Sequence, residues 1–561
     1  MPALAHSESG PLALRAGALD LVVQEGRLLG ICHAGVEVWR TVMFLYRDPA
    51  WATPRHGADI RKADLRDDGF SLHLAGSCPD VPSIRWSTDI QGTADGRIRF
   101  SVDVELHADL LTSRTGICVL HPASAAGAVL EVEHVDGRIS RSRFPERISA
   151  WQPFTQIRAL RHRFAPAGWA ICEFDGDDYE MEDQRNFSDA SFKTYSRSNF
   201  ASRPFRLDGG TRWRRSVTLT LEQAPRRRHR PVADAALSIV VSADSTARLP
   251  ALGVLANADN AVACARVPAL SHLRIDLRAG SPGSASSPLT SPSLFSHTLT
   301  PLRVDLILDG DADAAPACRQ LSEACVTHGI VVTALAIFPT SARAVQAART
   351  CFPHARIGGG TPFFFTHLNR LVLPPRLDFV TYTTCPIIHV ADDLSVMQSL
   401  ATLPEQLATL RARGVDAPVH VGPVGIGMSI DPFGVHVRHE PGSPVAMARD
   451  DARDHTAFGQ AWMLGYLSRM TAAGVASVTL AHADVFNALG ALVARQGAPV
   501  CRVRNPDPDR LAVLALDDGI SCQAWVANLS PQSLDIALVL PRATRQQSLR
   551  LAPYTWVHAS S

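Results

Sequence analysis

The sequence predicts a multidomain β + α/β protein with an N-terminal antiparallel β-sandwich, a central (β/α)8 barrel of the TIM type and a small C-terminal β-sandwich. Short β-rich runs with almost no helical periodicity fill the first 222 residues. Strand-like and helix-like runs then alternate, and short β runs return after residue 498. The 561 residues suffice for about three domains. We expect domains at 1–224, 246–497 and 498–561, with a linker at 225–245.

The N-terminal region is interpreted as antiparallel β structure because turn dipeptides such as Asp95-Gly96 and Asp136-Gly137 separate its runs. Strands of this spacing without helices are typical of a large sandwich. The basic segment 226–231 is short and isolated, so a solvated linker is favoured over a nucleic-acid patch. The expected strands are 19–23, 36–45, 98–106, 129–135, 169–174 and 212–221.

The central region alternates strands with helices. Eight such steps over about 250 residues match a TIM barrel, whose active site lies at the C-terminal ends of the strands. The Ser/Pro-rich segment 280–300 is interpreted as a loop insertion. The expected strands are 251–255, 272–277, 302–308, 331–338, 355–359, 378–382, 418–423 and 477–482, and the expected helices are 313–328, 341–351, 394–413 and 450–473.

The C-terminal region contains strand-like runs at 511–516, 522–528 and 534–540. Turn residues between these runs, such as Asp517-Asp-Gly519, favour a small antiparallel sandwich.

Composition excludes several classes of function. The net charge of +1 favours neither a nucleic acid nor an anionic membrane as partner. We expect no signal peptide and no membrane span, because no basic start precedes an apolar run and no run approaches 18 apolar residues. The 11 scattered cysteines indicate reduced thiols and a cytoplasmic protein. The oligomeric state stays open.

Motifs for cofactors and metals are weak or missing. The chain has no P-loop, no GxGxxG fingerprint and no GxSxG elbow, so we expect no cofactor and no serine nucleophile. His436, His439 and Glu440 could donate to a metal, but they lie in a Pro/Gly-rich stretch without the helical HExxH geometry. We therefore expect no metal.

Two histidines follow expected barrel strands with an aspartate close behind. His389 precedes Asp392, and His482 precedes Asp484. Either pair could act as a general base with an orienting carboxylate, and a structural histidine is the alternative for each. Asp309 follows a third strand.

The stretch 180–195 combines charge with aromatic residues. Polar side chains around Phe187 and Phe192 are what a small-molecule site needs, whereas a solvated hairpin is the alternative reading. The polar members are Glu180, Glu182, Asp183, Gln184, Arg185, Asn186, Asp189, Lys193 and Tyr195.

The same stretch closely resembles the central motif of the D-apionate lactonase (D-apionolactonase) family. Further similar segments are Tyr46-Arg-Asp-Pro-Ala-Trp-Ala-Thr53, Arg114-Thr-Gly-Ile-Cys-Val-Leu-His-Pro122, Thr366-His-Leu-Asn-Arg370, Pro386-Ile-Ile-His389 and Ala461-Trp-Met-Leu-Gly465. The resemblance implies the same three-part fold. It also implies hydrolysis of the lactone of a branched sugar acid, a small-molecule substrate, in bacterial catabolism of apiose.

Without metal or nucleophile motifs, direct general-base attack by water is the simplest route to lactone hydrolysis, and we assign hypothetical roles on that basis. Glu182 or Asp183 would share the base role with the His389–Asp392 pair. Lys193, Arg185 and Asn186 would bind the carbonyl and the oxyanion. Tyr195, Asp309, Asn369 and His482 would bind the rest of the substrate. These roles require the stretch 180–195 to lie near His389 at the barrel strand ends.

Two alternatives remain. A TIM-barrel glycoside hydrolase would need two carboxylates at the barrel mouth, but no glutamate ends any of the eight expected strands. A catalytically impaired sugar-binding homologue is the other alternative. It is suggested by Gln398, which stands where the family has a carboxylate, while Phe187 replaces the usual tryptophan.

Overall fold

A computed structural model describes residues 10–166, 168–198, 203–222, 236–257, 260, 263–264, 267, 269–279, 300–432, 444–543 and 545–561. The chain forms two compact units: a β-domain of residues 1–185 and 190–231, and a barrel unit of residues 186–189 and 232–561. The basic segment 226–231, residues 280–299 of the expected insertion and the residues His436, His439 and Glu440 lie outside the described residues.

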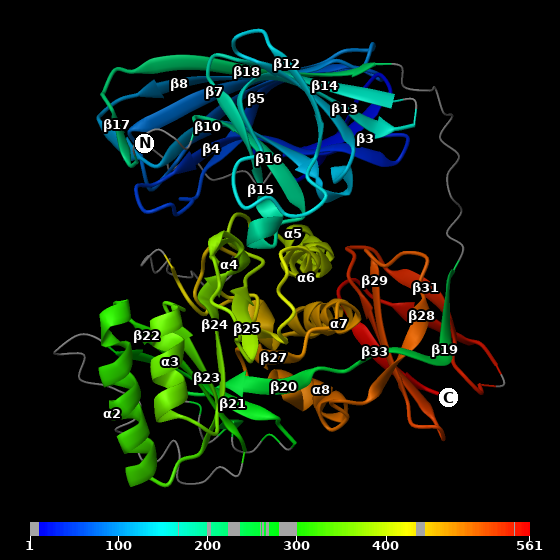
Figure 1. The fold of residues 1–561 in the computed structure, drawn as a ribbon. Helices are drawn as coiled ribbons and strands as arrows, with labels where there is room; N and C mark the ends of the chain where they lie inside the picture. Colours follow the sequence, from blue (N-terminus) through cyan, green and yellow to red (C-terminus); the bar gives the residue numbers. More distant parts are fainter. Residues whose placement is uncertain are drawn as a thin grey trace, which may run out of the picture. The chain divides into compact units, whose positions relative to one another are not determined.

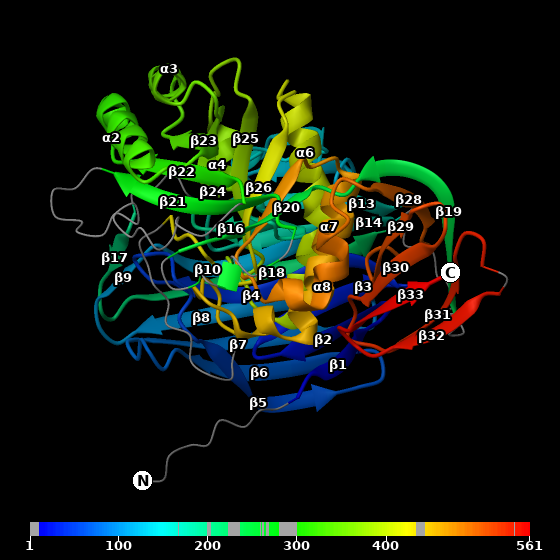
Figure 2. The same cartoon turned by 90° about the horizontal axis from the view of Figure 1, so that it is seen from below.

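The β-domain is antiparallel throughout its described part. Its main sheet has 16 strands among these residues, of which 14 run in the order β1-β2-β3-β4-β10-β16-β15-β13-β14-β18-β8-β7-β6-β5, while β11 pairs with β12 and β13 beside this path. The strands β9 and β17 form a separate two-stranded sheet. Figure 2 shows β5 to β8 side by side. The strands are β1 (Leu12–Ala16), β2 (Leu19–Gln24), β3 (Arg27–His33), β4 (Val36–Arg47), β5 (Gly57–Leu65), β6 (Phe70–Ser77), β7 (Ile84–Gly92), β8 (Ile98–Leu106), β9 (Leu110–Thr112), β10 (Arg114–Pro122), β11 (Val129–His134), β12 (Ile139–Arg143), β13 (Phe154–Ala165), β14 (Gly168–Asp175), β15 (Tyr179–Asp183), β16 (Ser191–Ser196), β17 (Phe205–Leu207) and β18 (Arg212–Glu222).

Alternating side chains build the core of the β-domain. In β6, Phe70, Leu72 and Leu74 are buried, whereas the residues between them face outward. Inward side chains from both ends of the sheet meet, since the rings of Phe44 on β4 and Trp86 on β7 lie 4.6 Å apart. One long sheet therefore encloses a core between its own halves.

Eight parallel strands close the barrel in the described part of the barrel unit, in the order β20 to β27 (Figure 1). This agrees with the eight strands expected from the sequence, to within a few residues at their ends. The strands are β20 (Ala251–Leu255), β21 (His272–Ala279), β22 (Leu302–Leu308), β23 (Val332–Phe338), β24 (Arg356–Phe364), β25 (Phe379–Thr384), β26 (Val419–Val424) and β27 (Ser477–Leu480).

Helices cover the outside of the barrel, and α2 and α3 lie side by side along it (Figure 1). The expected helix 394–413 is divided into α5, a 3-10 turn at Leu400–Thr402 and α6, because Pro404 lies in the first turn of α6 and lacks the N–H that would continue α5. The helices α4 and α8 were not predicted from the sequence pattern. The helices are α2 (Ala314–Thr327), α3 (Ala342–Cys351), α4 (Phe365–Arg370), α5 (Asp393–Ser399), α6 (Leu403–Ala412), α7 (Ala457–Ala472) and α8 (Val485–Val493).

A seven-stranded sheet completes the barrel unit in the described residues, in the order β32-β31-β19-β28-β29-β30-β33. Its strand β19 (Leu237–Arg248) overlaps the segment that was expected to be a linker at 225–245. Ile239 and Val241 are buried in this sheet while Val240 between them is exposed, so the alternation of a strand continues through the expected linker. The other strands are β28 (Pro499–Arg504), β29 (Leu511–Asp517), β30 (Cys522–Asn528), β31 (Leu534–Val539), β32 (Gln547–Leu551) and β33 (Trp556–Ser560).

Membrane spans were also sought among the helices of the described residues. None of these helices is both long enough and apolar enough to cross a bilayer.

Candidate active site

The barrel unit joins a histidine in the loop after β25 to a carboxylate from the stretch 180–195. Nδ1 of His389 lies 2.5 Å from Oδ2 of Asp189, and both side chains are largely buried. The ring of Phe187 packs edge-on against the imidazole at 5.0 Å between ring centroids. A carboxylate on Nδ1 fixes the tautomer and stabilises the imidazolium, so Nε2 is the nitrogen that can take a proton.

Asp189 ends the tetrapeptide Asn186–Asp189, which belongs to the barrel unit. Hydrogen bonds within that unit hold this tetrapeptide in place. Asn369 on α4 donates through Nδ2 to Oδ1 of Asn186 at 3.0 Å. Gln406 on α6 donates to Oγ of Ser188 at 3.2 Å. Ser188 has a φ of +69°, which costs a non-glycine residue on the order of 1–3 kcal/mol and persists only where surrounding contacts enforce it. The two predicted substrate-binding residues Asn186 and Asn369 thus bind each other and anchor this turn.

Asp392, the predicted partner of His389, caps a helix. Its carboxylate accepts hydrogen bonds from the backbone N–H of Ser395 at 3.0 Å and from the Ser395 hydroxyl at 2.9 Å. An aspartate directly before α5 satisfies a backbone donor that the helix cannot satisfy itself. The expected His389–Asp392 pairing is therefore wrong, and Asp189 is the carboxylate on Nδ1 of His389.

The second predicted pair also has other partners. Nε2 of His482 lies 3.6 Å from the buried carboxylate of Asp454, while Asp484 binds Nδ1 of His455 at 2.6 Å. The expected pairing of His482 with Asp484 is therefore wrong. The two imidazole rings meet edge-on at 4.9 Å between centroids. The Asp454 carboxylate beside it raises the pKa of His482, although burial opposes this shift.

Asp454 links this histidine to the end of β26. Its two oxygens accept the backbone N–H groups of Ile426 at 2.8 Å and Gly427 at 3.0 Å. The thiol of Cys385, directly after β25, donates to the carbonyl of the same Ile426 at 3.6 Å. Ile426 therefore links the end of β25 to Asp454.

The remaining predicted barrel residue is less constrained. Asp309 follows β22 directly and is exposed. Gln398, the amide that replaces a family carboxylate, is half-buried in the last turn of α5. Neither side chain belongs to the His389 or His482 pair.

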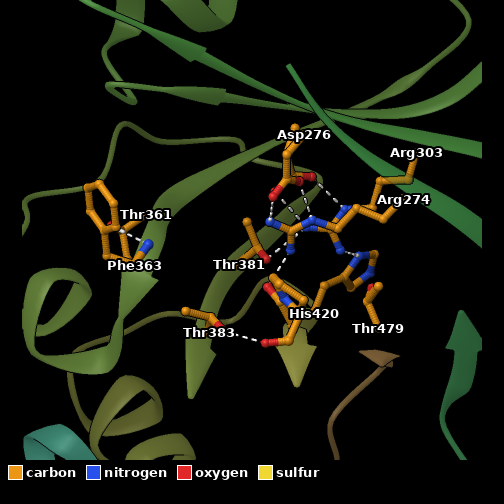
Figure 3. Close-up of polar contacts among 12 residues, drawn as sticks. Arg274, Asp276, Arg303, Thr361, Phe363, Thr381, Thr383, His420 and Thr479 are labelled. Atoms are coloured by element: carbon orange, nitrogen blue, oxygen red, sulfur yellow. Dashed lines mark hydrogen bonds and ion pairs between the residues drawn. The ribbon is translucent and has the colours of Figure 1, made fainter. Parts of the chain in front are cut away.

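A network of charged side chains fills the barrel interior (Figure 3). Arg303 donates to both oxygens of Asp305 at 2.8 and 3.2 Å, and Arg274 reaches the same carboxylate at 3.1 Å. Arg274 also donates to Asp276 at 2.7 and 3.3 Å and to the carbonyl of Gly422. Residues two apart on one strand point the same way, so β21 and β22 each present an Arg-x-Asp pair to the interior.

Glycines make room for the large side chains of this network. A Cβ on Gly253 would lie 2.3 Å from the ring of His272, and one on Gly358 would lie 2.4 Å from the ring of Phe379. His420 stacks on Phe379 with 4.4 Å between ring centroids, and His272 bonds Thr479 at 2.8 Å. The Gly358-Gly-Gly run therefore serves packing inside the barrel.

The β-domain carries a second polar cluster on strands β15 and β16. The Lys193 ammonium lies 2.7 Å from the Glu182 carboxylate and is only 3% exposed. Burial lowers the pKa of Lys193, and the Glu182 charge opposes that shift. The Tyr195 hydroxyl donates to Glu180 at 2.5 Å, and the guanidinium of Arg114 lies 3.7 Å from the Tyr195 ring centroid.

Asp183 and Arg185 bind each other at the end of β15. Arg185 donates through Nε at 2.9 Å and through Nη2 at 2.7 Å, and Asp183 also accepts the backbone N–H of Ser149 at 3.0 Å. Arg185 further donates to the carbonyls of Pro145 at 2.8 Å and Glu146 at 3.2 Å. Burial raises the pKa of Asp183, whereas Arg185 opposes this. The pair bridges chain segments of the β-domain.

Metal ligands were also sought. Among the residues that the structure describes, no group of three or more His, Cys, Asp or Glu side chains is arranged to hold a metal ion.

Comparison with known proteins identifies the family. Residues 3–224 match the family domain described as "D-apionate lactonase, N-terminal domain", and residues 251–507 match "D-apionate lactonase, TIM barrel domain". A protein of Brucella anthropi named "D-apionate lactonase" is 32% identical over 503 residues, covering 85% of this chain and 83% of the relative. The chain belongs to the D-apionate lactonase family.

Solved structures share less with this family member. A β-arabinopyranosidase aligns over 98% of this chain and 100% of its own at 10% identity and a TM-score of 0.35. An endoxylanase from Clostridium papyrosolvens aligns over 58% of this chain and 99% of its own at 8% identity and a TM-score of 0.39. Neither likeness carries an argument about activity.

Sequence analysis did not assign roles to Asp189, Asp454 or Asp276 in this family member. Asp189 was visible as a polar residue of the motif stretch, but nothing in the sequence paired it with His389. Asp454 lies ahead of α7 and far from His482 in the chain. Asp276 lies in a strand that alternates polar and apolar residues, two residues after Arg274, and that spacing was the signal for a buried pair.

Proposed function

We propose that this protein hydrolyses D-apionolactone to D-apionate. Membership of the D-apionate lactonase family supports the substrate. The observation that carries the chemistry is the largely buried His389–Asp189 pair, whose histidine lies in the loop after β25. An imidazole held by a carboxylate on Nδ1 is a general base suited to neutral pH.

The proposed reaction is direct attack by water. Nε2 of His389 takes a proton from water as the water oxygen bonds to the lactone carbonyl carbon. The bond between the carbonyl carbon and the ring oxygen then breaks, and the imidazolium returns the proton to the ring oxygen, which leaves as an alcohol. Asp189 stabilises the imidazolium between these two transfers. The product is the open hydroxy acid, and no covalent enzyme intermediate is needed.

Several residues receive structural roles in this proposal. Asp392 caps α5, Asn186 and Asn369 anchor the tetrapeptide, and Asp183 with Arg185 braces the β-domain. These roles follow from the partners that their polar atoms bind.

Other predicted residues are retained as candidates. Glu182 and Lys193 remain candidate catalytic groups of the β-domain, because a buried ion pair beside Tyr195 is a costly arrangement to maintain for stability alone. Asp309, Tyr195 and His482 remain candidate substrate-binding residues. We also infer that the β-domain and the C-terminal sheet are β-sandwiches and that the enzyme is a cytoplasmic bacterial protein.

Glycoside hydrolysis has no comparable support. Residues 232–561 contain three glutamates, of which Glu440 lies outside the described residues, and neither Glu323 nor Glu405 lies in or directly after a barrel strand. A retaining or inverting glycosidase needs two carboxyl groups facing the sugar ring.

The proposed function is tested by purifying the protein and following acid release from D-apionolactone by pH-stat titration. Aryl glycosides and other aldonolactones serve as competing substrates. We expect D-apionolactone to give the highest kcat/KM. Hydrolysis of an aryl glycoside without any lactonase activity would overturn the proposal.

A further inference from the structure

One carboxylate of the barrel-interior network reaches accessible surface. The side chain of Asp276 is 20% exposed, whereas the side chain of Asp305 is fully buried and that of Arg274 is 1% exposed. His272, Arg274 and Asp276 lie at every second position of β21 and point into the barrel, as their contacts with β26 and β27 require. Asp276 is the member of this row nearest the C-terminal end of the strand.

The exposed part of Asp276 faces the C-terminal mouth. On its N-terminal side the barrel is filled by His272 and Arg274, which are buried against Thr479 and Gly422. The route to solvent that remains inside a closed barrel leads towards the strand ends, where TIM barrels place their substrates. Asp276 therefore forms part of the floor beneath that mouth.

The network balances its charge with Asp276 ionised. Arg274 and Arg303 contribute two positive charges, and Asp305 and Asp276 contribute two negative ones. Burial with Arg303 and Arg274 nearby lowers the pKa of His272 to about 3, so this histidine adds no charge at neutral pH. A buried network with a protonated Asp276 would carry an unpaired positive charge, which is costly in a low dielectric.

His420 is uncharged in the same network. Burial lowers its pKa far below the usual value, and the Arg303 charge adds to that shift. Arg303 also donates to Nδ1 of His420 at 3.4 Å, which requires a lone pair on that nitrogen. Because both histidines are neutral, the net charge of the network is set by the two arginines and the two aspartates alone.

The carboxylate of Asp276 has acceptor capacity beyond these contacts. Among the described residues, Arg274 donates to the Asp276 carboxylate through Nε to one oxygen and through Nη2 to the other. An ionised carboxylate offers about four lone-pair sites, so one further donor can bind each oxygen. Burial raises the pKa of Asp276 while Arg274 opposes that shift. The two bonds from Arg274 hold this partly desolvated acceptor in one orientation.

We propose that Asp276 is a specificity-determining residue that accepts hydrogen bonds from hydroxyl groups of the substrate. Arg274 and Asp305 are positioning residues, since they hold the Asp276 carboxylate ionised and fixed in orientation. This inference rests on the proposed function for the identity of the hydroxylated ligand. A desolvated carboxylate prefers hydroxyl donors and rejects apolar groups, because an unpaired buried charge is costly.

The test compares the wild-type enzyme with Asp276→Asn, Asp276→Glu and the matched control Asp416→Asn, an exposed aspartate ahead of β26. Kinetics with D-apionolactone and titration calorimetry with D-apionate give KM, kcat and Kd. We expect both Asp276 variants to raise KM and Kd by about 10–100-fold, the value of a hydrogen bond to a charged group. We expect kcat to change by less than about threefold, and Asp416→Asn to match the wild type.

The outcomes separate the two proposals. An active wild type with unchanged KM and Kd in both Asp276 variants would overturn this inference and leave the proposed function standing. A wild type that neither hydrolyses the lactone nor binds D-apionate would overturn the proposed function, and this inference with it. A purely structural role would lower kcat and the unfolding temperature without the selective rise in KM, and would also overturn it. If Asp276→Asn does not fold, the KM and Kd of Asp276→Glu, which keeps the charge beside Arg274, test the inference instead.

Discussion

Asp189 and His389 are 200 residues apart in the chain, yet Oδ2 of Asp189 lies 2.5 Å from Nδ1 of His389. The tetrapeptide that carries Asp189 belongs to the barrel unit, although β15 before it and β16 after it belong to the β-domain. Its turn is fixed by α4 and α6 and includes a left-handed serine. Such an enforced conformation is typical of positions where a side chain must be held for chemistry.

The first prediction concerns this pair. Replacing His389 by Gln, or Asp189 by Asn, is expected to lower kcat by about 10²–10⁴-fold, the usual contribution of a positioned general base. Asp89→Asn is the matched control, because Asp89 binds Nδ1 of His73 at 2.8 Å on the exposed surface of the β-domain. Steady-state kinetics and circular dichroism provide the readouts. Activity within twofold of the wild type in Asp189→Asn would remove the pair from the mechanism.

A second prediction addresses the anchor of the tetrapeptide. Asn186→Ala and Asn369→Ala each remove the buried hydrogen bond between the two amides, so each is expected to cost about 1–3 kcal/mol of unfolding free energy. The double variant should cost less than the sum of the two, with a coupling energy of about 1 kcal/mol. Urea unfolding of all four proteins measures this cycle. Strict additivity would mean that the hydrogen bond does not stabilise the fold.

The barrel was predictable because its strands are apolar runs of the expected length. The strand Leu302–Leu308 was predicted with its observed bounds, although it contains Arg303 and Asp305. The charges did not hide the strand because they alternate with Leu302, Val304 and Leu306. Residues 237–245 of the expected linker were mispredicted because the sheet partners of β19 lie near the end of the chain, about 250–300 residues later.

The pairing of side chains was not predictable in the same way. Asp392 and Asp484 were chosen as partners because they follow His389 and His482 closely in the sequence. A polar residue so near a helix start instead binds local groups, as Asp392 does with Ser395. The actual partners, Asp189 and Asp454, come from distant segments that only the tertiary fold brings together.

The third prediction separates helix capping from catalysis at Asp392. Asp392→Ala should lower the unfolding free energy by about 0.5–2 kcal/mol, the usual value of an N-cap. The value of kcat should stay within about threefold of the wild type at a temperature where the variant is folded. Thermal unfolding and steady-state kinetics measure the two effects. A large loss of kcat with unchanged stability would restore Asp392 as a catalytic residue.

The fourth prediction follows from the raised pKa of His482. Because its pKa is higher in the folded protein than in the unfolded chain, the His482–Asp454 interaction stabilises the fold fully below the unfolded pKa of about 6.5. This contribution is lost as the pH rises through the folded pKa. His482→Asn should therefore be more destabilising, relative to the wild type, at about pH 5.5 than at about pH 9. Urea unfolding at both pH values checks this, and a pH-independent difference would contradict it.

The last prediction decides the role of the buried Glu182–Lys193 pair. Lys193→Met leaves the Glu182 carboxylate buried without its cation, so it should cost about 3–5 kcal/mol of unfolding free energy. The double variant Glu182→Gln/Lys193→Met removes both charges and should recover much of that stability. If the pair only stabilises the β-domain, kcat should recover together with stability. If either residue acts on the substrate, the double variant should stay folded while kcat remains at least about 10²-fold below the wild type. Measuring stability and kcat on the same samples separates the two roles.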